Sequence, residues 1–370
     1  MTDGSVLVVN AGSSSLKLSV LDPADTVVAA LDIDPWDGSA GDSALAGFTA
    51  GLTGVTAVGH RVVHGGSAFR SATRIDPATR DAIAGLTSLA PLHQPRAIAG
   101  VDAASQLLPG VPAVACFDTA FHARMPAPAA TYALPAAWRD RYGLRRYGFH
   151  GLSHSYAARR AAVMLGRPLA GLRLVTCHLG AGASLAAIAD GVSVDTTMGF
   201  TPLEGLVMAT RSGSVDPGLL VWLLREGGLG LAELADGLEH ESGLAGLAGL
   251  PDASGDMRDV HAAAAAGNPA AQLAADVYSH RLRREIAAMT AALGGLDALV
   301  FTGGVGEHHP AVRSAAADRL RYLGVAIDPG RNAAAQRDTD ITAAGAPART
   351  LVITAREDIE IARQARALLT

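Results

Sequence analysis

The feature that most constrains this chain is a unit that occurs twice: an apolar strand, a turn of small residues, and a returning apolar strand. The first copy covers residues 6–20 with its turn at 10–15, and the second covers residues 174–188 with its turn at 179–184. Small residues let the backbone turn tightly and leave amide and hydroxyl donors uncovered, and Lys17 adds a cation beside the first turn. One such hairpin could be an ordinary polar hairpin, but the repeat predicts two similar domains whose hairpins face phosphate groups.

Length and composition fit two domains and argue against several classes of partner. A chain of 370 residues is long for one core, and 49% hydrophobic but only 4% aromatic residues predict cores of Val, Leu, Ile and Ala. The net charge of −5 comes without a dense Lys/Arg run, which argues against nucleic acid, and no segment has the pattern of a leader or a membrane span. Cys116 and Cys177 lie in apolar runs without metal-ligand spacing, so we expect reduced thiols and a cytoplasmic location.

Strands and helices alternate along the chain, which predicts an α/β fold with functional loops at the C-terminal ends of the strands. The expected strands beyond the two hairpins are 55–63, 111–117, 297–301 and 351–354. The expected helices are 75–89, 98–107, 155–165, 269–293 and a last helix that contains Glu357. We expect a short strand and loops over 22–52, and a polar loop over 194–205.

Three glycine-rich turns each follow an apolar strand, at 10–15, 180–184 and 303–306. None of them has the spacing of a Rossmann or P-loop phosphate site. One turn of this kind would be weak evidence, whereas three turns, two of them in a repeat, favour the binding of nucleotide phosphates.

Four charged residues indicate what chemistry accompanies these turns. Arg61 and Arg211 each lie in a glycine-bearing loop, and two such arginines fit a clamp for a transferring phosphoryl group. Asp118 at a strand end and Glu357 at a helix start fit Mg²⁺, which needs few carboxylates beside phosphates. Each residue alone would more often be a surface side chain or a helix cap. The set predicts phosphoryl transfer and leaves the acceptor open.

Ten segments together resemble the acetokinase family, the acetate kinases, within the superfamily of sugar kinases, heat-shock chaperones and actin. They occur in family order over essentially the whole chain: VLVVNAGSSSLKLSV, GHRVVHGG, LAPLHQP, FDTAFHARMP, RRYGFHGLSH, HLGAGAS, DTTMGFTPLEGLVMATRSGSVDP, SGDMRDV, FTGGVGEH and REDIEIAR. The resemblance implies duplicated ribonuclease-H-like (actin-like ATPase) domains with a cleft between them. The first would comprise residues 1–122 plus 357–370, and the second, which would bind nucleotide and dimerise, residues 123–356.

The same resemblance implies an activity. The γ-phosphoryl group of ATP would be transferred reversibly to acetate, giving acetyl phosphate and ADP, by direct in-line attack of the carboxylate. Mg²⁺ would be the cofactor, with Mn²⁺ as a possible substitute, and the enzyme would be a homodimer. Acetate and ATP would be its small-molecule substrates, and we expect neither a nucleic acid nor a membrane as a partner.

Roles for single residues also follow from the resemblance. The implied catalytic residues are Arg61, Asp118, His150 and Arg211, with His93 as a further active-site histidine, and the implied metal ligands are Asn10 and Glu357. The implied acetate pocket consists of Arg61, Val63, Leu92, Phe149 and Pro202. The implied ATP-binding residues are Ser13, Ser15, Lys17, His178, Gly180, Gly182, Asp256, Met257, Arg258, Gly303, Gly304, Val305, Gly306 and Glu307.

The chain departs from the family pattern at four positions. Ala181 and His308 stand where the family usually has Asn, Gln94 replaces another Asn, and Ala68 stands where the family often has an acidic residue. The amide missing at Ala181 removes one possible contact with the phosphoryl donor.

Three other activities stay open at this point. A propionate kinase would use the same mechanism, because one methylene in an apolar pocket discriminates by only about 1–3 kcal/mol. A non-catalytic, actin-like nucleotide-binding protein would have no need of the residues on the acyl side. A sugar kinase would need more carboxylate or amide partners for a polyol than these loops offer.

Overall fold

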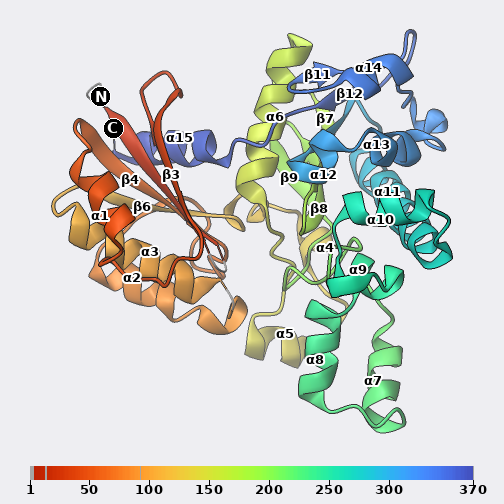
Figure 1. The fold of residues 1–370 in the computed structure, drawn as a ribbon, viewed down its shortest axis with the longest axis horizontal. Coiled ribbons are helices and arrows are strands. Elements are labelled where there is room, and N and C mark those ends of the chain that lie inside the picture. The colour runs from red at the N-terminus through yellow and green to blue at the C-terminus, as the bar shows by residue number, and fades with distance from the viewer. Residues whose placement is uncertain (1–3, 13–14, 92, 370) are drawn as a thin grey trace. The chain divides into compact units, whose positions relative to one another are not determined.

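The computed structural model describes residues 4–12, 15–91 and 93–369. The chain divides into two units. Unit 1 comprises Met1–Ala123, Phe149–Tyr156 and Arg356–Thr370, and unit 2 comprises Arg124–Gly148 and Ala157–Ala355. Each unit contains one six-stranded mixed sheet (Figure 1). Because the last helix belongs to the first unit, unit 1 is discontinuous in sequence.

The sheet of unit 1 has the strand order β3-β2-β1-β4-β6-β5. Its strands are β1 (Ser5–Ala11), β2 (Leu16–Leu21), β3 (Val27–Ile33), β4 (Val55–Val62), β5 (Thr73–Arg74) and β6 (Ala113–Phe117). The first three strands form an antiparallel meander, β1, β4 and β6 run parallel, and β5 pairs antiparallel with β6. The register of β1 and β2 places Asn10 opposite Lys17, which confirms the predicted N-terminal hairpin.

Helices cover both faces of this sheet (Figure 1). The helix α15 (Glu357–Leu369) packs on one face, where Val6 and Val8 of β1 join Ile361 in one apolar cluster. The helices α1 (Ser43–Ala50), α2 (Pro77–Ala84) and α3 (Gln94–Leu107) lie on the other face, toward which Leu7 and Val9 point. The two faces therefore follow the two-residue alternation of side chains along a strand.

Unit 2 repeats the same sheet. From one edge its order is β9-β8-β7-β10-β12-β11, with an antiparallel meander in β7–β9, parallel β7, β10 and β12, and antiparallel β11. Its strands are β7 (Arg173–Leu179), β8 (Ala183–Ala189), β9 (Val192–Thr196), β10 (Ala298–Thr302), β11 (Thr339–Asp340) and β12 (Arg349–Val352). Because chain order and strand direction match position by position, the predicted duplication is confirmed.

The longest helix of unit 2, α11 (Pro269–Leu293), packs on β7, β8 and β9. The others are α4 (Ala127–Ala130), α5 (Ala136–Tyr142), α6 (Gly151–Leu165, which begins in unit 1), α7 (Pro217–Arg225), α8 (Leu231–His240), α9 (Gly243–Ala248), α10 (Met257–Ala265), α12 (Gly303–His308), α13 (Pro310–Ala317) and α14 (Pro329–Ala334). Asn268 caps α11 by accepting hydrogen bonds from the backbone N–H groups of Ala270 and Ala271, which confirms the predicted helix. No helix within the described residues is long and apolar enough to cross a membrane.

Several predicted elements need correction. The segment 303–306 is not an open turn: the chain turns at Gly303, whose φ is +76°, and this residue is already the first of α12. The segment 22–52 contains α1 as well as β3, and the helix predicted over 75–89 ends at Ala84, before Gly85. The helices α3 and α6 begin four residues earlier than predicted, at Gln94 and Gly151.

Candidate active site

Three parallel strands of unit 1 and the helix α15 bring four predicted site residues to one edge and one face of the sheet. Asn10 lies near the end of β1, Arg61 near the end of β4, and Asp118 directly after β6. In each strand these positions continue the alternation of the face that α15 covers, and Glu357 is the first residue of α15. The C-terminal ends of parallel strands share one edge of a sheet, where α/β proteins bind their ligands.

Arg61 is the cation on which this group converges. Its Nη2 donates to Oδ2 of Asp118 at 2.7 Å, and its Nε lies 3.2 Å from the same oxygen. Nη1 donates to Oδ1 of Asn10 at 3.4 Å, and Nε lies 3.6 Å from Oε2 of Glu357. Three side chains therefore place acceptor oxygens around one guanidinium, and arginine is the residue type best suited to bidentate carboxylate contacts.

The Arg61–Asp118 pair is largely removed from water. The side chain of Asp118 is 2% exposed and that of Arg61 is 22% exposed. Burial lowers the pKa of Arg61, but attraction to Asp118 and Glu357 outweighs burial and holds that pKa above its ordinary value. The guanidinium is therefore charged at every physiological pH, and removal of Asp118 would leave a poorly compensated buried charge.

A close backbone contact positions the start of α6 beside Asp118. The backbone N–H of Gly151 donates to the carbonyl oxygen of Asp118 at 2.9 Å, and a Cβ at Gly151 would lie 2.2 Å from that oxygen. His150, the preceding residue, has a φ of +55°, in the left-handed region that costs non-glycine residues free energy. A backbone conformation of this kind persists only where the surrounding structure holds it.

Two predicted acetate-pocket residues of unit 1, Val63 and Phe149, lie two residues in sequence from Arg61 and Gly151, respectively. Phe149 is buried, and its carbonyl oxygen lies 2.9 Å from Nε2 of His122. The rings of Phe149 and His64 make an edge-on contact, with 5.4 Å between their centroids. Val63 directly follows β4 and is half-buried. Leu92 falls outside the described residues, and His93 is the N-cap residue of α3.

The first hairpin turn is only partly described. Ser13 falls outside the described residues, while the carbonyl oxygen of Ser15 accepts a hydrogen bond from the backbone N–H of Gly12 at 2.7 Å. The exposed Lys17 pairs with Asp32 of β3 at 3.6 Å. In this structure the ammonium group of Lys17 therefore pairs with a carboxylate of the neighbouring strand.

In unit 2, a cavity of about 530 Å³ collects predicted nucleotide-binding residues from three separate segments. They come from the second hairpin, the start of α10 and the start of α12, and the cavity is lined by Gly180, Asp256, Met257, Arg258, Gly304 and Val305. Ala181, Tyr278, His308 and His309 also line it. Asp256 caps α10, and hydrogen bonds from Arg258 lower the pKa of Asp256 to about 2.

Other predicted ATP-binding residues do not line this cavity. Gly182 lies in the second hairpin turn, where its carbonyl oxygen accepts from the backbone N–H of Gly180, and His178 lies near the end of β7. Gly306 is buried within α12. Oε1 of the buried Glu307 accepts from the backbone N–H groups of Gly303 and Ala355, which is a structural contact.

Arg211 lies in unit 2 together with Pro202. Nη1 of Arg211 donates to the carbonyl oxygen of Pro202 at 3.3 Å, and Nε lies 3.5 Å from Oε2 of Glu239. No sequence pattern pointed to Glu239, because it is 28 residues away from Arg211 in the sequence and its helix has no motif of its own.

Gln94, which replaces an Asn that is usual in the family, has a packing role in this chain. Its Nε2 donates to the carbonyl oxygens of His64 and Ile83, and the side chain is fully buried. Gln94 thereby ties the start of α3 to the loop that follows Val63.

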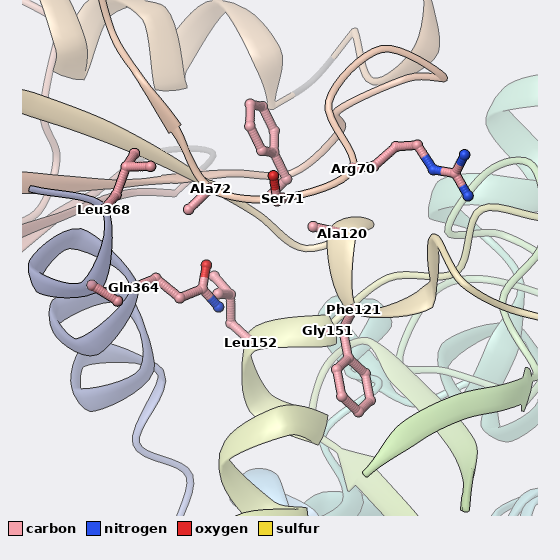
Figure 2. A pocket seen from close by; sticks show the side chains of 11 residues that line it. Arg70, Ser71, Ala72, Ala120, Phe121, Gly151, Leu152, Gln364 and Leu368 are labelled. Carbon is pink, nitrogen blue, oxygen red and sulfur yellow. The ribbon is translucent and has the colours of Figure 1, made fainter. Parts of the chain in front are cut away.

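A further cavity lies in unit 1, and none of the predicted site residues lines it. It measures about 370 Å³, and Figure 2 shows Ser71, Ala120, Leu152 and Gln364 around it. The predicted site residues of unit 1 therefore lie outside that cavity.

Comparisons with known proteins agree with this geometry. Residues 45–363 match the model of the acetokinase family. An acetate kinase from Synechococcus sp. is 56% identical over 312 residues, which is 84% of this chain and 76% of the relative, and one from Gloeobacter violaceus is 54% identical over 83% of this chain and 75% of the relative. The crystal structure of Porphyromonas gingivalis acetate kinase covers 99% of this chain and all of its own, with TM-score 0.91 and 35% identity. A propionate kinase structure from Francisella tularensis has the same coverage, with TM-score 0.90 and 34% identity.

Proposed function

The chain belongs to the acetokinase family, and from that premise we propose that it transfers the γ-phosphoryl group of ATP reversibly to acetate, forming acetyl phosphate and ADP. The observation that carries this proposal is the convergence of Asn10, Asp118 and Glu357 on Arg61, in a chain whose relatives at 54–56% identity are acetate kinases. A set of this kind provides fixed charge at the site of transfer, and Arg61 engages both of its carboxylates.

The chemistry of the reaction explains this choice of residues. Acetate is already an anion at neutral pH, so the reaction needs no general base. The difficulty is to bring that anion against the polyanionic phosphates, and preorganised positive charge is the main remedy in phosphoryl transfer. We assign this part to Arg61 and Arg211, with His150 at the transferred group. Asp118 orients Arg61 through the contacts at 2.7 and 3.2 Å.

We propose Mg²⁺ as the cofactor, with Asn10, Asp118 and Glu357 as the residues that would hold or orient it. Their oxygens already converge on one cation, Arg61, and hard oxygen donors are what Mg²⁺ prefers. When bound with ATP, Mg²⁺ would neutralise phosphate charge. The protein residues would keep their own roles, in which Arg61 binds the acyl side and Asp118 fixes its direction.

We propose the 530 Å³ cavity of unit 2 as the adenosine site. Support comes from its lining by Asp256, Met257 and Arg258 beside Gly304 and Val305, as the resemblance implied. The glycine at 304 leaves open space at the start of α12, since a Cβ there would meet nothing within 4 Å. The assignment of nucleotide binding to residues 123–356 is part of the same proposal.

A propionate kinase is the second candidate, and one observation favours it: the propionate kinase from F. tularensis matches almost as well as the P. gingivalis acetate kinase, with 34% against 35% identity. The acetate kinases at 54–56% identity favour acetate more strongly. Val63 and Phe149 border the implied pocket and would set the difference.

We also propose a homodimer in the cytoplasm. The helix α7 has no buried residue, and it exposes Leu219, Val221, Trp222 and Leu224 by 39–55%. A cluster of large apolar side chains in water usually marks an interface, and a second copy of the chain is the occupant we assign. Two buried, reduced cysteines are in line with a reducing compartment.

The test of the proposed activity is acyl phosphate formation from Mg-ATP, trapped with hydroxylamine, with acetate, propionate and butyrate in parallel. We expect the highest kcat/KM with acetate. A higher kcat/KM with propionate would establish the second candidate. Absence of hydroxamate with all three acids, in protein that binds ATP, would reject the kinase activity and favour a nucleotide-binding protein without turnover.

A further inference from the structure

The loop that contains Arg211 rests on the last turn of α8. The backbone N–H of Ser212 donates to the carbonyl oxygen of Leu238 at 3.1 Å. The hydroxyl of Thr210 donates to the backbone carbonyl oxygen of Glu239 at 2.9 Å. The last carbonyls of a helix have no partner inside the helix, so the loop satisfies two of them. The C-terminal end of a helix also carries partial negative charge, which favours a nearby cation such as Arg211.

The side chain of Glu239 extends this contact to the guanidinium itself. Its Oε2 lies 3.5 Å from Nε of Arg211, while Nη1 of Arg211 donates to the carbonyl oxygen of Pro202. Arg211 is thus held at Nε and at Nη1. No contact within the described residues engages Nη2, so this end of the guanidinium can meet an anion.

From these contacts we propose that Glu239 is a positioning residue that fixes the guanidinium of Arg211 for the transferring phosphoryl group. This inference rests on the proposed function. It adds a residue that neither the motifs of the sequence nor the family assignment singles out.

The exposure of Arg211 and Glu239 to water distinguishes a positioning role of Glu239 from a purely structural one. The side chains of Arg211 and Glu239 are 22% and 30% exposed. Unlike the buried carboxylate of Asp118, that of Glu239 keeps contact with water, and ion pairs of this kind contribute little to folding stability. Loss of Glu239 should therefore leave the protein folded, and its effect should fall on catalysis.

The experiment compares Glu239→Ala, Glu239→Gln and Glu241→Ala in the hydroxylamine assay. Glu241 lies two residues further on, and its side chain makes no ion pair within the described chain, so it is the matched control. We expect E239A to lower kcat by about 10- to 100-fold with an unchanged KM for ATP, since small misplacements of catalytic groups have effects of this size. E239Q keeps the shape of the side chain and an acceptor oxygen near Nε, so we expect it to retain kcat within about threefold, and E241A to match the wild type.

A double-mutant cycle tests whether Glu239 acts through Arg211. In an Arg211→Ala background, E239A should cause no further loss of kcat, because the group that it positions is gone. An unchanged kcat in E239A, or an equal loss in both backgrounds, would overturn the proposal.

A second readout does not depend on turnover, so it separates this inference from the proposed function. In arginine-labelled protein, the Nε–H signal of Arg211, identified by its absence in Arg211→Lys, should exchange with water faster in E239A than in E241A. Equal exchange rates would overturn the proposal even if the wild type proves to be an active kinase. Faster exchange would support it even if acetate is not the substrate.

Discussion

At the scale of single residues, the site of unit 1 depends on the pairing of Arg61 with Asp118. Arg61 has two carboxylates within 3.6 Å, and only Asp118 bonds to it at both Nε and Nη2. Asp118 is almost fully buried, and its carboxylate lies directly against this guanidinium. We expect that replacing the charge of Asp118 changes the direction in which the side chain of Arg61 points, while the guanidinium itself stays in the site.

We predict that Asp118→Asn lowers kcat by about 100-fold or more, the size of effect seen when a preorganised charge is disturbed. Steady-state kinetics on folded protein would measure it. The matched control is Asp102→Asn, which breaks an Arg–Asp contact of the same 2.7 Å, to Arg80, in a pair whose side chains are 34% and 51% exposed. Wild-type kcat in D118N would contradict the role given to Asp118.

A second residue-scale prediction concerns acid stability. His60 is 1% exposed, its ring nitrogens find no hydrogen-bond partner within the described chain, and burial lowers the pKa of His60 to about 4. The unfolded chain binds a proton near pH 6.5, so the folded state loses stability as the pH falls from 6.5 toward 4. From this shift, His60 should cost about 2 kcal/mol between pH 7.5 and pH 5.

The measurement is urea unfolding of His60→Leu and wild type at both pH values. The variant should gain about 2 kcal/mol relative to wild type on going to pH 5. Exposed His280→Leu serves as the control for loss of a histidine. An equal difference between H60L and wild type at the two pH values would show that His60 is not the group that titrates.

Residue positions differ in how far the sequence predicted them. Asn10, Arg61 and Asp118 lie at strand ends, so strand alternation and parallel pairing bring them together, and the motifs predicted the group. Glu239 and Gly151 were missed because their roles depend on contacts with Arg211 and Asp118 across long sequence separations. No local pattern contains that information.

At the scale of elements, the position of α15 decides where Glu357 lies. α15 packs on β4 at Gly59, where a Cβ would lie 2.5 Å from Cγ2 of the buried Ile361. Glycine is therefore required for the helix to approach this closely. The first residue of the same helix, Glu357, contacts Arg61, so packing and site are linked through one rigid element.

We predict that Gly59→Ala destabilises the protein by about 1–3 kcal/mol, the usual cost of overpacking a core, and also lowers kcat because Glu357 moves with α15. Urea unfolding and steady-state kinetics would measure the two effects. Gly47→Ala is the control, since a Cβ added at Gly47 of α1 would meet no atom within 4 Å, and alanine is the better helix former. Equal stability of G59A and G47A would contradict the close approach.

Elements were predicted where a strong local pattern exists. Both hairpins and α11 follow from apolar alternation and from an Asn-Pro start. The helix α1 was missed because its segment SALAGFTA is small and weakly patterned, and α12 because its glycines suggested an open turn. In both cases packing against the sheet of the same unit decides the local structure.

At the scale of the whole molecule, the two matching sheets confirm the duplication that the hairpins predicted. The exposed face of α7 is the feature that bears on assembly. If a second copy covers it, a charge on that face should separate the copies.

We predict that Trp222→Glu converts a dimer to a monomer in size-exclusion chromatography with light scattering, because the carboxylate would be buried without a partner. Trp138→Glu is the matched control, since Trp138 on α5 is exposed by the same 55%. A wild-type monomer, or a W222E dimer, would contradict the assigned interface.

The central claim is that an oxygen of acetate attacks the γ-phosphorus of ATP. The most direct measurement uses acetate labelled with ¹⁸O in both oxygens, Mg-ATP and hydroxylamine, with mass spectrometry of the products. Attack at the γ-phosphorus makes one labelled oxygen the bridge of acetyl phosphate, and hydroxylamine then releases phosphate with one ¹⁸O while ADP stays unlabelled. Labelled AMP, or hydroxamate accompanied by unlabelled phosphate, would contradict the account.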